Sequence, residues 1–230
     1  MGIGNSFFGK QKLQFLYEKL YHLALKGMNY SIDDTESNIT VHTILQCRDR
    51  ISSPSSVLFE LGGKNGEFVK KILEAWQGMY YDLYVFEPSP QHFEVLHNSL
   101  PESPFLHLYN YQFSDSNNKI NTTTLDAFCY QNKIPFIDFL KLNEDGNELK
   151  VLNGARELFE QNKIKIVLFQ FGKANVESKT HFRDLYNFFV ADFDLFRILT
   201  DGLRPLKQYS ESCEIFHSAH YLAIIKNSYF

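Results

Sequence analysis

The ten residues FELGGKNGEF, at positions 59–68, mark the point where an apolar strand gives way to a helix. Residues 57–61 form a short apolar run with a single acid, which is typical of a buried strand, and residues 67–76 return to helical spacing. Glycines at such a junction let the backbone bend sharply and approach a ligand, and the first N–H groups of the helix can point at its polar atoms. The stretch therefore predicts a strand, a ligand-binding turn and a helix in succession.

Short apolar runs and helical patterns alternate along the rest of the chain. Such alternation predicts an α/β fold, in which a mostly parallel sheet is covered by helices on both faces. Seven strands are expected, and the last of them can close the sheet antiparallel: residues 57–61, 81–86, 105–113, 137–142, 164–171, 193–199 and 221–225. The expected helices cover residues 67–76, 91–99, 125–132, 148–161 and 180–191.

The first 50 residues have a different pattern. Apolar residues recur mostly three or four apart over residues 11–26, which predicts an amphipathic helix that Gly27 ends. A second short helix is expected over residues 39–48, after a polar and acidic stretch. We expect residues 1–50 to form an N-terminal helical cap on a main α/β domain of residues 51–230, the two making one structural domain.

Composition argues against several classes of protein. The net charge of −4 and the scattered Lys and Arg residues give no basic surface for nucleic acid. The most apolar stretch, residues 164–171, is far shorter than the roughly 20 residues that cross a bilayer, and the N-terminus has no apolar signal segment. The cysteines and histidines show neither a C-x-x-C pair nor a zinc-binding spacing. We therefore expect a cytoplasmic protein without a membrane span, a nucleic-acid partner or a metal site, and a homodimer is left open.

The glycine spacing favours one nucleotide cofactor over another. The pattern is E-x-G-x-x-x-G from Glu60 to Gly66, whereas the dinucleotide fingerprint G-x-G-x-x-G would need a glycine at Leu61. A carboxylate at the strand tip repels a pyrophosphate but suits the cationic amino end of S-adenosylmethionine. Glu87 follows the second strand, 21 residues beyond Gly66, where an acid can accept hydrogen bonds from both hydroxyls of a ribose.

With these features the sequence resembles the FkbM family of methyltransferases over about residues 27–225. Five blocks carry the resemblance: residues 57–68, 85–90, 124–126, 139–148 with 151–155, and 167–171. The resemblance implies a seven-stranded Rossmann-like class I methyltransferase fold, S-adenosylmethionine as cofactor, and O-methylation of a small molecule or of a sugar in a capsule, lipopolysaccharide or natural product. The polar segment that begins at Gly27 is then expected to cover the cofactor cleft or to line the acceptor pocket.

The resemblance also assigns residues to the site. The residues expected to bind the cofactor are Glu60, Gly62, Gly63, Gly66, Glu87 and Asn143. Those expected near the reacting atoms are Lys141, Asp145 and Glu148, with Gly146 in the same block. Asp145 and Glu148 are the candidate acceptors of the hydroxyl proton, or simply acids that stabilise a helix N-terminus. Lys141 can orient the acceptor, pair with Glu148 or extend to solvent at the strand end.

Several polar positions depart from the family pattern. The family usually has Asp, Ala, Asn, Asp, Glu and Glu where this chain has Glu60, Gly63, Lys64, Asn143, Asp145 and Gln170. An amide cannot accept a proton at neutral pH, so a base at Asn143 or Gln170 is excluded. Two hypotheses follow, namely an active O-methyltransferase and a catalytically weakened module that binds a cofactor or glycan.

Overall fold

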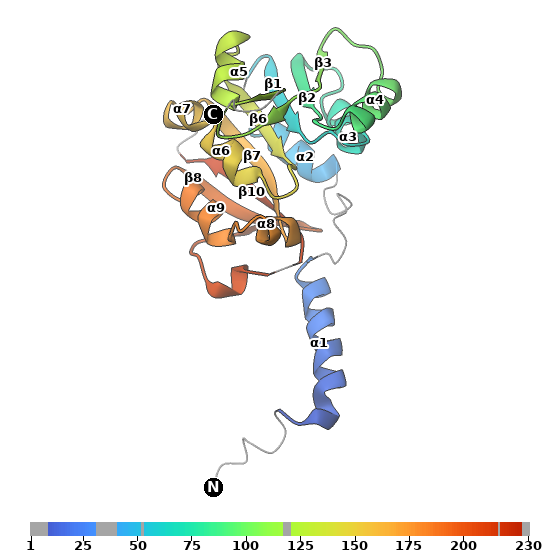
Figure 1. Cartoon of the computed structure of the whole chain (residues 1–230), viewed down its shortest axis with the longest axis vertical. Coiled ribbons are helices and arrows are strands. Elements are labelled where there is room, and N and C mark those ends of the chain that lie inside the picture. Colours follow the sequence, from blue (N-terminus) through green and yellow to red (C-terminus); the bar gives the residue numbers. More distant parts are fainter. Residues whose placement is uncertain (1–8, 31–40, 52, 117–120, 216, 227–230) are drawn as a thin grey trace.

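One eight-stranded sheet forms the centre of the structure, a computed structural model that describes residues 9–30, 41–51, 53–116, 121–215 and 217–226 (Figure 1). Its strands are β1 (Ser56–Leu61), β2 (Tyr81–Phe86), β3 (Leu106–Tyr109), β6 (Ile137–Leu142), β7 (Ile164–Phe171), β8 (Phe193–Leu199), β9 (Gly202–Pro205) and β10 (Ala219–Ile225). The order across the sheet is β3-β2-β1-β6-β7-β10-β8-β9. The first five strands of this order are parallel, and β10 lies antiparallel between β7 and β8.

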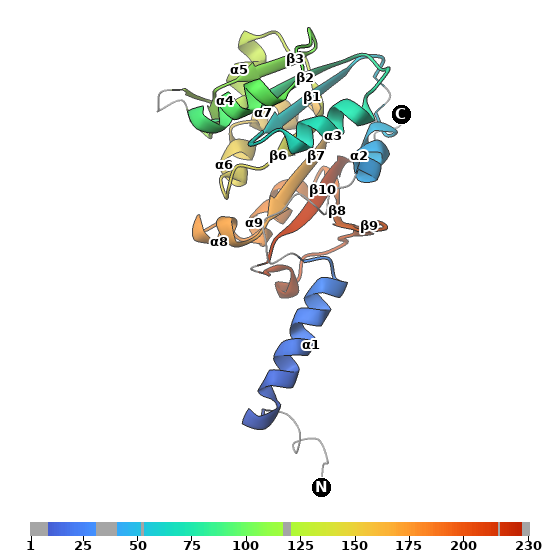
Figure 2. The same ribbon diagram turned by 90° about the vertical axis from the view of Figure 1, so that its right-hand side faces the viewer.

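Helices cover both faces of this sheet, as Figures 1 and 2 show. Buried side chains of α2 (Val41–Arg48), α3 (Glu67–Ala75) and α4 (Pro90–Ser99) pack on one face. Those of α5 (Leu125–Gln131), α6 (Glu148–Asn153), α7 (Arg156–Glu160) and α9 (Phe182–Phe189) pack on the other, and α8 (Lys173–Glu177) follows β7. The predicted α/β fold with a mostly parallel sheet is confirmed.

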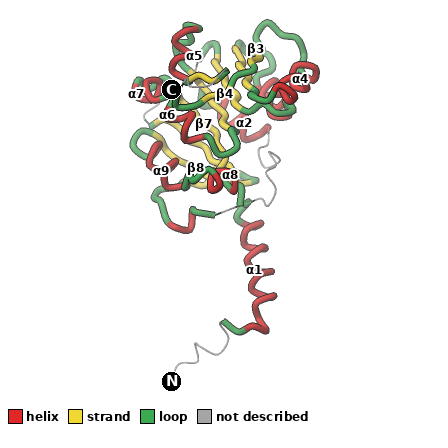
Figure 3. The backbone as a smooth tube through the Cα atoms, in the orientation of Figure 1, coloured by secondary structure: helices red, strands yellow, loops and turns green. Residues whose placement is uncertain are grey.

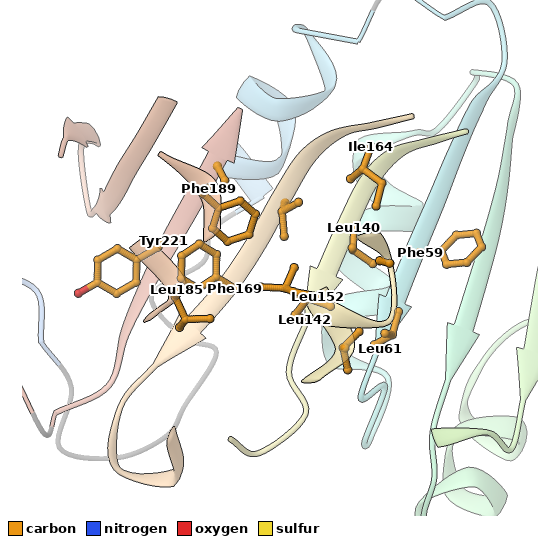
Figure 4. Close-up of a cluster of buried hydrophobic side chains, with 14 of the residues drawn as sticks. Phe59, Leu61, Leu140, Leu142, Leu152, Ile164, Phe169, Leu185, Phe189 and Tyr221 are labelled. Carbon is orange, nitrogen blue, oxygen red and sulfur yellow. The ribbon is translucent and has the colours of Figure 1, made fainter. Parts of the chain in front are cut away.

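The α9 face carries a row of side chains that crosses the sheet at one level. Strand register pairs each member with the next, in the order Phe86, Leu61, Leu142, Phe169, Tyr221 and Arg197. Figure 4 shows members of this row packed with Leu185 and Phe189 of α9. Five members are apolar or aromatic, as expected for a core face, whereas the sixth is an arginine.

The structure differs from the predicted elements in three places. Residues 105–113 form two strands, β3 and β4 (Gln112–Phe113), and β4 pairs with β5 (Thr122–Thr123). The hairpin strand β9 makes the main sheet eight-stranded and not seven-stranded. The helix expected over residues 148–161 is broken at Gly154, where a Cβ would overlap the backbone carbonyl of Ser114.

The N-terminal helix stands away from the sheet. Helix α1 (Gln14–Gly27), which follows a short 3₁₀ turn, projects from the end of the molecule near β8 and β9 (Figures 1 and 3). Its apolar side chains are mostly exposed, among them Phe15, Leu16, Leu20 and Leu23. The predicted helix is present, but α1 does not cover the core. The expected division into a cap of residues 1–50 and a main domain of residues 51–230 stays a prediction. Among the described residues, no helix has both the length and the apolar character to cross a membrane.

Candidate functional site

The glycine turn after β1 is held against the ends of two neighbouring strands. The N–H groups of Gly62 and Gly63 donate to the carbonyl of Phe86, and the N–H of Asn143 donates to Leu61 at 3.0 Å. Gly62 has φ +82°, and a Cβ on it would overlap the carbonyl oxygen of Asn143. Packing between the β1 and β6 turns therefore requires glycine at position 62, whether or not a ligand also approaches the backbone there.

Glu87 lies directly beside this turn, at the end of β2. One carboxylate oxygen accepts the N–H of Lys64 at 2.8 Å, and the other accepts the N–H of Ser89 at 2.9 Å. Because only 3% of Glu87 is exposed, these two contacts fix its orientation. Gly66, with φ +76°, begins α3 on the other side of the turn.

Glu60 and Lys141 form a buried ion pair on the α3 face of the sheet. Register aligns the two residues on β1 and β6, so their side chains leave the sheet on the same side. The Lys141 ammonium lies 3.1 Å from a Glu60 oxygen and 4.3 Å from the centre of the Phe68 ring. Lys141 is only 2% exposed. It therefore does not extend to solvent, and its carboxylate partner is Glu60 and not Glu148.

Glu148 holds the loop that follows β6. One of its oxygens accepts the N–H groups of Glu144 at 3.0 Å and Gly146 at 3.4 Å, and the other accepts the amide of Asn175 at 2.6 Å. Burial raises the pKa of Glu148, although these hydrogen bonds oppose the shift. Glu148 thus connects the β6 loop to α8. Its position in the first turn of α6 agrees with the hypothesis that this acid stabilises a helix N-terminus.

A second connection crosses the site from the glycine turn to the β6 loop. The Lys64 ammonium lies 2.9 Å from an oxygen of Asp145 and 3.5 Å from the side-chain oxygen of Asn143. Both charged side chains are partly open to solvent, so this ion pair contributes little stability. Asp145 is the most exposed carboxylate of the site, with 73% of its side chain accessible.

Glu144 is a buried acid that was not among the predicted site residues. It is 5% exposed, and one of its oxygens has no hydrogen-bond partner among the described residues. Burial, followed by the negative charges of Glu148, Glu87 and Asp145, raises its pKa to about 8, and Lys64 opposes the shift. Its place inside the polar block after β6 was the available signal, but its burial was not visible in the sequence.

These contacts gather four acidic side chains and one ammonium at the carboxyl end of the sheet, which we call the carboxylate cluster. The acids are those of Glu87, Glu144, Asp145 and Glu148, and the ammonium is that of Lys64. Because its pKa is raised to about 8, Glu144 is largely protonated near pH 7, and the negative charge comes from the other acids. A negative balance of charge attracts a cation, so the cluster suits the sulfonium and amino groups of S-adenosylmethionine and disfavours a pyrophosphate. The residues present therefore fit S-adenosylmethionine, the cofactor predicted from the sequence.

A cavity of about 260 Å³ opens at the same end of the sheet, between β4 and α6. Ser114, Asp115, Asn147 and Lys150 are among its lining residues. Ser114 and Asp115 were not predicted as site residues, although polar residues directly after an expected strand are a signal for a ligand site. Within the described part of the chain, no three His, Cys, Asp or Glu side chains are grouped to hold a metal ion.

A model of the FkbM methyltransferase domain matches residues 61–196 of this chain. The chain belongs to this family. Membership identifies S-adenosylmethionine as the cofactor, and a class I methyltransferase fold agrees with the strand order. A separate comparison with curated proteins found no match.

Several solved structures share the fold of this FkbM family member at low sequence identity. The FkbM methyltransferase of Methylobacillus flagellatus KT superposes with a TM-score of 0.54 and 16% identity, over 75% of this chain and 44% of that one. A putative O-methyltransferase from Klebsiella pneumoniae gives 0.51 and 12%, over 96% and 92%. The fibrillarin/Nop5p complex gives 0.51 and 14%, over 85% and 87%. The chain thus spans less than half of the first of these proteins.

Proposed function

We propose that the chain is an S-adenosylmethionine-dependent O-methyltransferase that acts on a hydroxyl of a small molecule or glycan. The observation that carries the proposal is the carboxylate cluster between the glycine turn, the end of β2 and the β6 loop. When bound, the cofactor supplies a methyl group on a cationic sulfur. The cluster provides the negative charge that such a cofactor requires, in a place that the family pattern also assigns to it.

Glu87 and the glycine turn would hold the nucleoside part of the cofactor. A carboxylate can accept about four hydrogen bonds, and the described contacts of Glu87 use two of them. The remaining positions are available to the two hydroxyls of a ribose. Glu60 and Asn143 would keep the glycine turn in position, because Glu60 is fixed by Lys141 and Asn143 packs against Gly62.

Asp145 is the group that we assign to the proton of the acceptor hydroxyl. It lies on the loop after β6 and is the most solvent-accessible acid of the cluster. Methyl transfer from sulfur is an in-line displacement, which depends on alignment, and an acid that takes up the hydroxyl proton assists it. Glu148 and Lys141 act as positioning residues, since their described contacts are with the loop backbone, Asn175 and Glu60.

Glu87→Ala should weaken S-adenosylmethionine binding by about 2 kcal/mol, because charged hydrogen bonds to the ribose are lost. Calorimetric titration with S-adenosylmethionine measures the change. Glu94→Ala, which removes an exposed acid of α4, is the control and should bind as the parent does. An unchanged dissociation constant in folded Glu87→Ala would remove Glu87 from the site.

Asp145→Asn should lower turnover roughly 100-fold and leave cofactor affinity almost unchanged, since general-base catalysis typically contributes that factor. Release of S-adenosylhomocysteine with sugar and alcohol acceptors is the assay. Lys64→Ala is the matched control, because it removes the same ion pair but keeps the carboxylate. Equal turnover of Asp145→Asn and the parent would refute the assignment of Asp145.

The same assay distinguishes an active O-methyltransferase from the second hypothesis, a catalytically weakened module that binds a cofactor or glycan. A parent protein that binds S-adenosylmethionine but releases no S-adenosylhomocysteine with any acceptor would support it. In that case Asn143→Asp with Gln170→Glu, which restores the acids usual in the family, should produce activity. If the amides are instead adapted to the acceptor of an active enzyme, the same pair of changes should lower turnover.

A further inference from the structure

Arg197 of β8 is a buried cation for which the described residues provide no carboxylate. It is 7% exposed and takes the last place in the row of side chains that crosses the α9 face. One guanidinium nitrogen donates to the hydroxyl of Tyr30 at 2.7 Å, and the Tyr30 ring centre lies 4.7 Å from the guanidinium carbon. Nε, also buried, has no hydrogen-bond partner in the described part of the chain. Because buried charges are normally paired, this guanidinium requires an anion.

The space beside Arg197 is a cavity of about 780 Å³ with basic walls, which we call the basic cavity. Arg204 and Lys207 line it together with Arg197, and no described Asp or Glu does so. Glu214 is near in sequence, but its oxygens accept the N–H groups of Phe182 and Arg183 and the hydroxyl of Tyr209. In the described structure Glu214 therefore bonds to these three neutral donors and forms no ion pair with Arg197, Arg204 or Lys207.

We propose that the basic cavity binds the phosphate group of an organic phosphate. A phosphate monoester carries about −1.5 to −2 charges and three acceptor oxygens, which match three cations and the Ser210 and Ser212 hydroxyls that also line the cavity. A guanidinium such as that of Arg197 can bind two phosphate oxygens at once. The volume exceeds that of a phosphate alone and falls in the range of small-molecule sites. The aromatic rings of Tyr30 and Tyr221 would contact the organic part.

The basic cavity is separate from the carboxylate cluster. Strand β8 lies four places from β1 in the sheet, with β6, β7 and β10 between them. The nearest part of the cluster follows β6, which lies three places from β8, and neighbouring strands are about 4.8 Å apart, so the two sites are separated by at least roughly 14 Å across the sheet. Binding in the basic cavity should therefore leave the affinity for S-adenosylmethionine unchanged, which allows the present inference and the proposed function to fail independently.

Calorimetric titration of the whole chain with phenyl phosphate, inorganic phosphate and phenol tests the inference. We expect phenyl phosphate to bind about tenfold more tightly than inorganic phosphate, and phenol not to bind measurably. Arg197→Gln should abolish binding, but it alters a buried residue and its thermal unfolding must be checked. The variant that combines Arg204→Gln and Lys207→Gln changes exposed residues, should fold normally and should lose about tenfold in affinity. Lys173→Gln, which removes an exposed lysine outside the cavity, is the control.

Two results would overturn the inference. The first is a parent protein that does not bind phenyl phosphate. If that protein gains binding after Asp33→Asn, Asp34→Asn and Glu36→Gln, these acids of the chain are the natural anion. The second is equal binding by the parent and by the variant that lacks Arg204 and Lys207. S-adenosylmethionine is titrated into every variant, and a dissociation constant equal to that of the parent shows that the cofactor site is intact.

Discussion

Gly62→Ala is expected to destabilise the fold by about 3 kcal/mol, the sum of two costs. A residue with a side chain at φ +82° loses roughly 1–2 kcal/mol, and a new Cβ that meets packed atoms costs about 1–3 kcal/mol more. The second cost is unavoidable here, because the overlapping atom is the backbone carbonyl of Asn143, in a loop that Glu148 and the end of β1 hold in place. Urea unfolding followed by circular dichroism measures the loss.

Gly78→Ala is the matched control for Gly62→Ala. Gly78 has φ +80°, almost the value at Gly62, but an added Cβ there would meet nothing within 4 Å. The control should therefore lose only the roughly 1–2 kcal/mol of backbone strain. If both variants lose the same free energy of unfolding, the close contact between the β1 and β6 turns is not as described.

The stability of the protein should fall as pH rises from about 5 to about 8, and Glu144 should be a main cause. Its pKa is raised by burial and by three nearby acids, from an ordinary value of 4.5 to about 8. Between these values the folded state holds a proton that the unfolded state has lost, so each increase in pH favours unfolding. The expected loss is on the order of 2–4 kcal/mol, since one pKa unit corresponds to about 1.4 kcal/mol.

Glu144→Gln should remove most of this dependence on pH. The amide has nearly the same shape as the protonated acid but does not titrate, so the variant should equal the parent at pH 5 and exceed it at pH 8. Glu148 has a pKa raised in the same direction and will leave a smaller slope. Urea unfolding at pH 5, 6.5 and 8 measures the curves, with Glu94→Gln as an exposed control. Parallel curves for Glu144→Gln and the parent would contradict the burial of this acid.

Local patterns predicted the strands well because those signals lie within a few residues. The strand expected at residues 137–142 is found as β6 with the same bounds, since its apolar residues are contiguous. The break at Gly154 was not predicted, because the close approach of Gly154 to the carbonyl of Ser114 joins residues that are distant in sequence. The helix at residues 11–26 was predicted from its spacing, but spacing cannot say whether the apolar face finds a partner.

Site chemistry was harder to predict where it depends on register between strands. Lys141 was expected to orient the acceptor, to pair with Glu148 or to extend to solvent, and pairing of β1 with β6 instead gives it Glu60 as its carboxylate partner, on the opposite side of the sheet from α9. Arg197 was not predicted as a site residue, because its contact with Tyr30 joins residues 167 positions apart. Patterns in one sequence show which residues are polar and what they follow, whereas the first pairing depends on how β1 and β6 align and the second on where the segment after α1 packs.

The position of β10 has a consequence for how the chain acquires its structure during synthesis. Strand β10 is bonded to β7 on one side and to β8 on the other, yet it follows both of them in the chain. When β8 and β9 have left the ribosome, they can form only a hairpin with no strand to join it to β7. A nascent chain thus exposes two unpaired strand edges, which can pair with other chains, until residues 219–225 emerge. Slow translation just before that point would lengthen the period in which nascent chains aggregate.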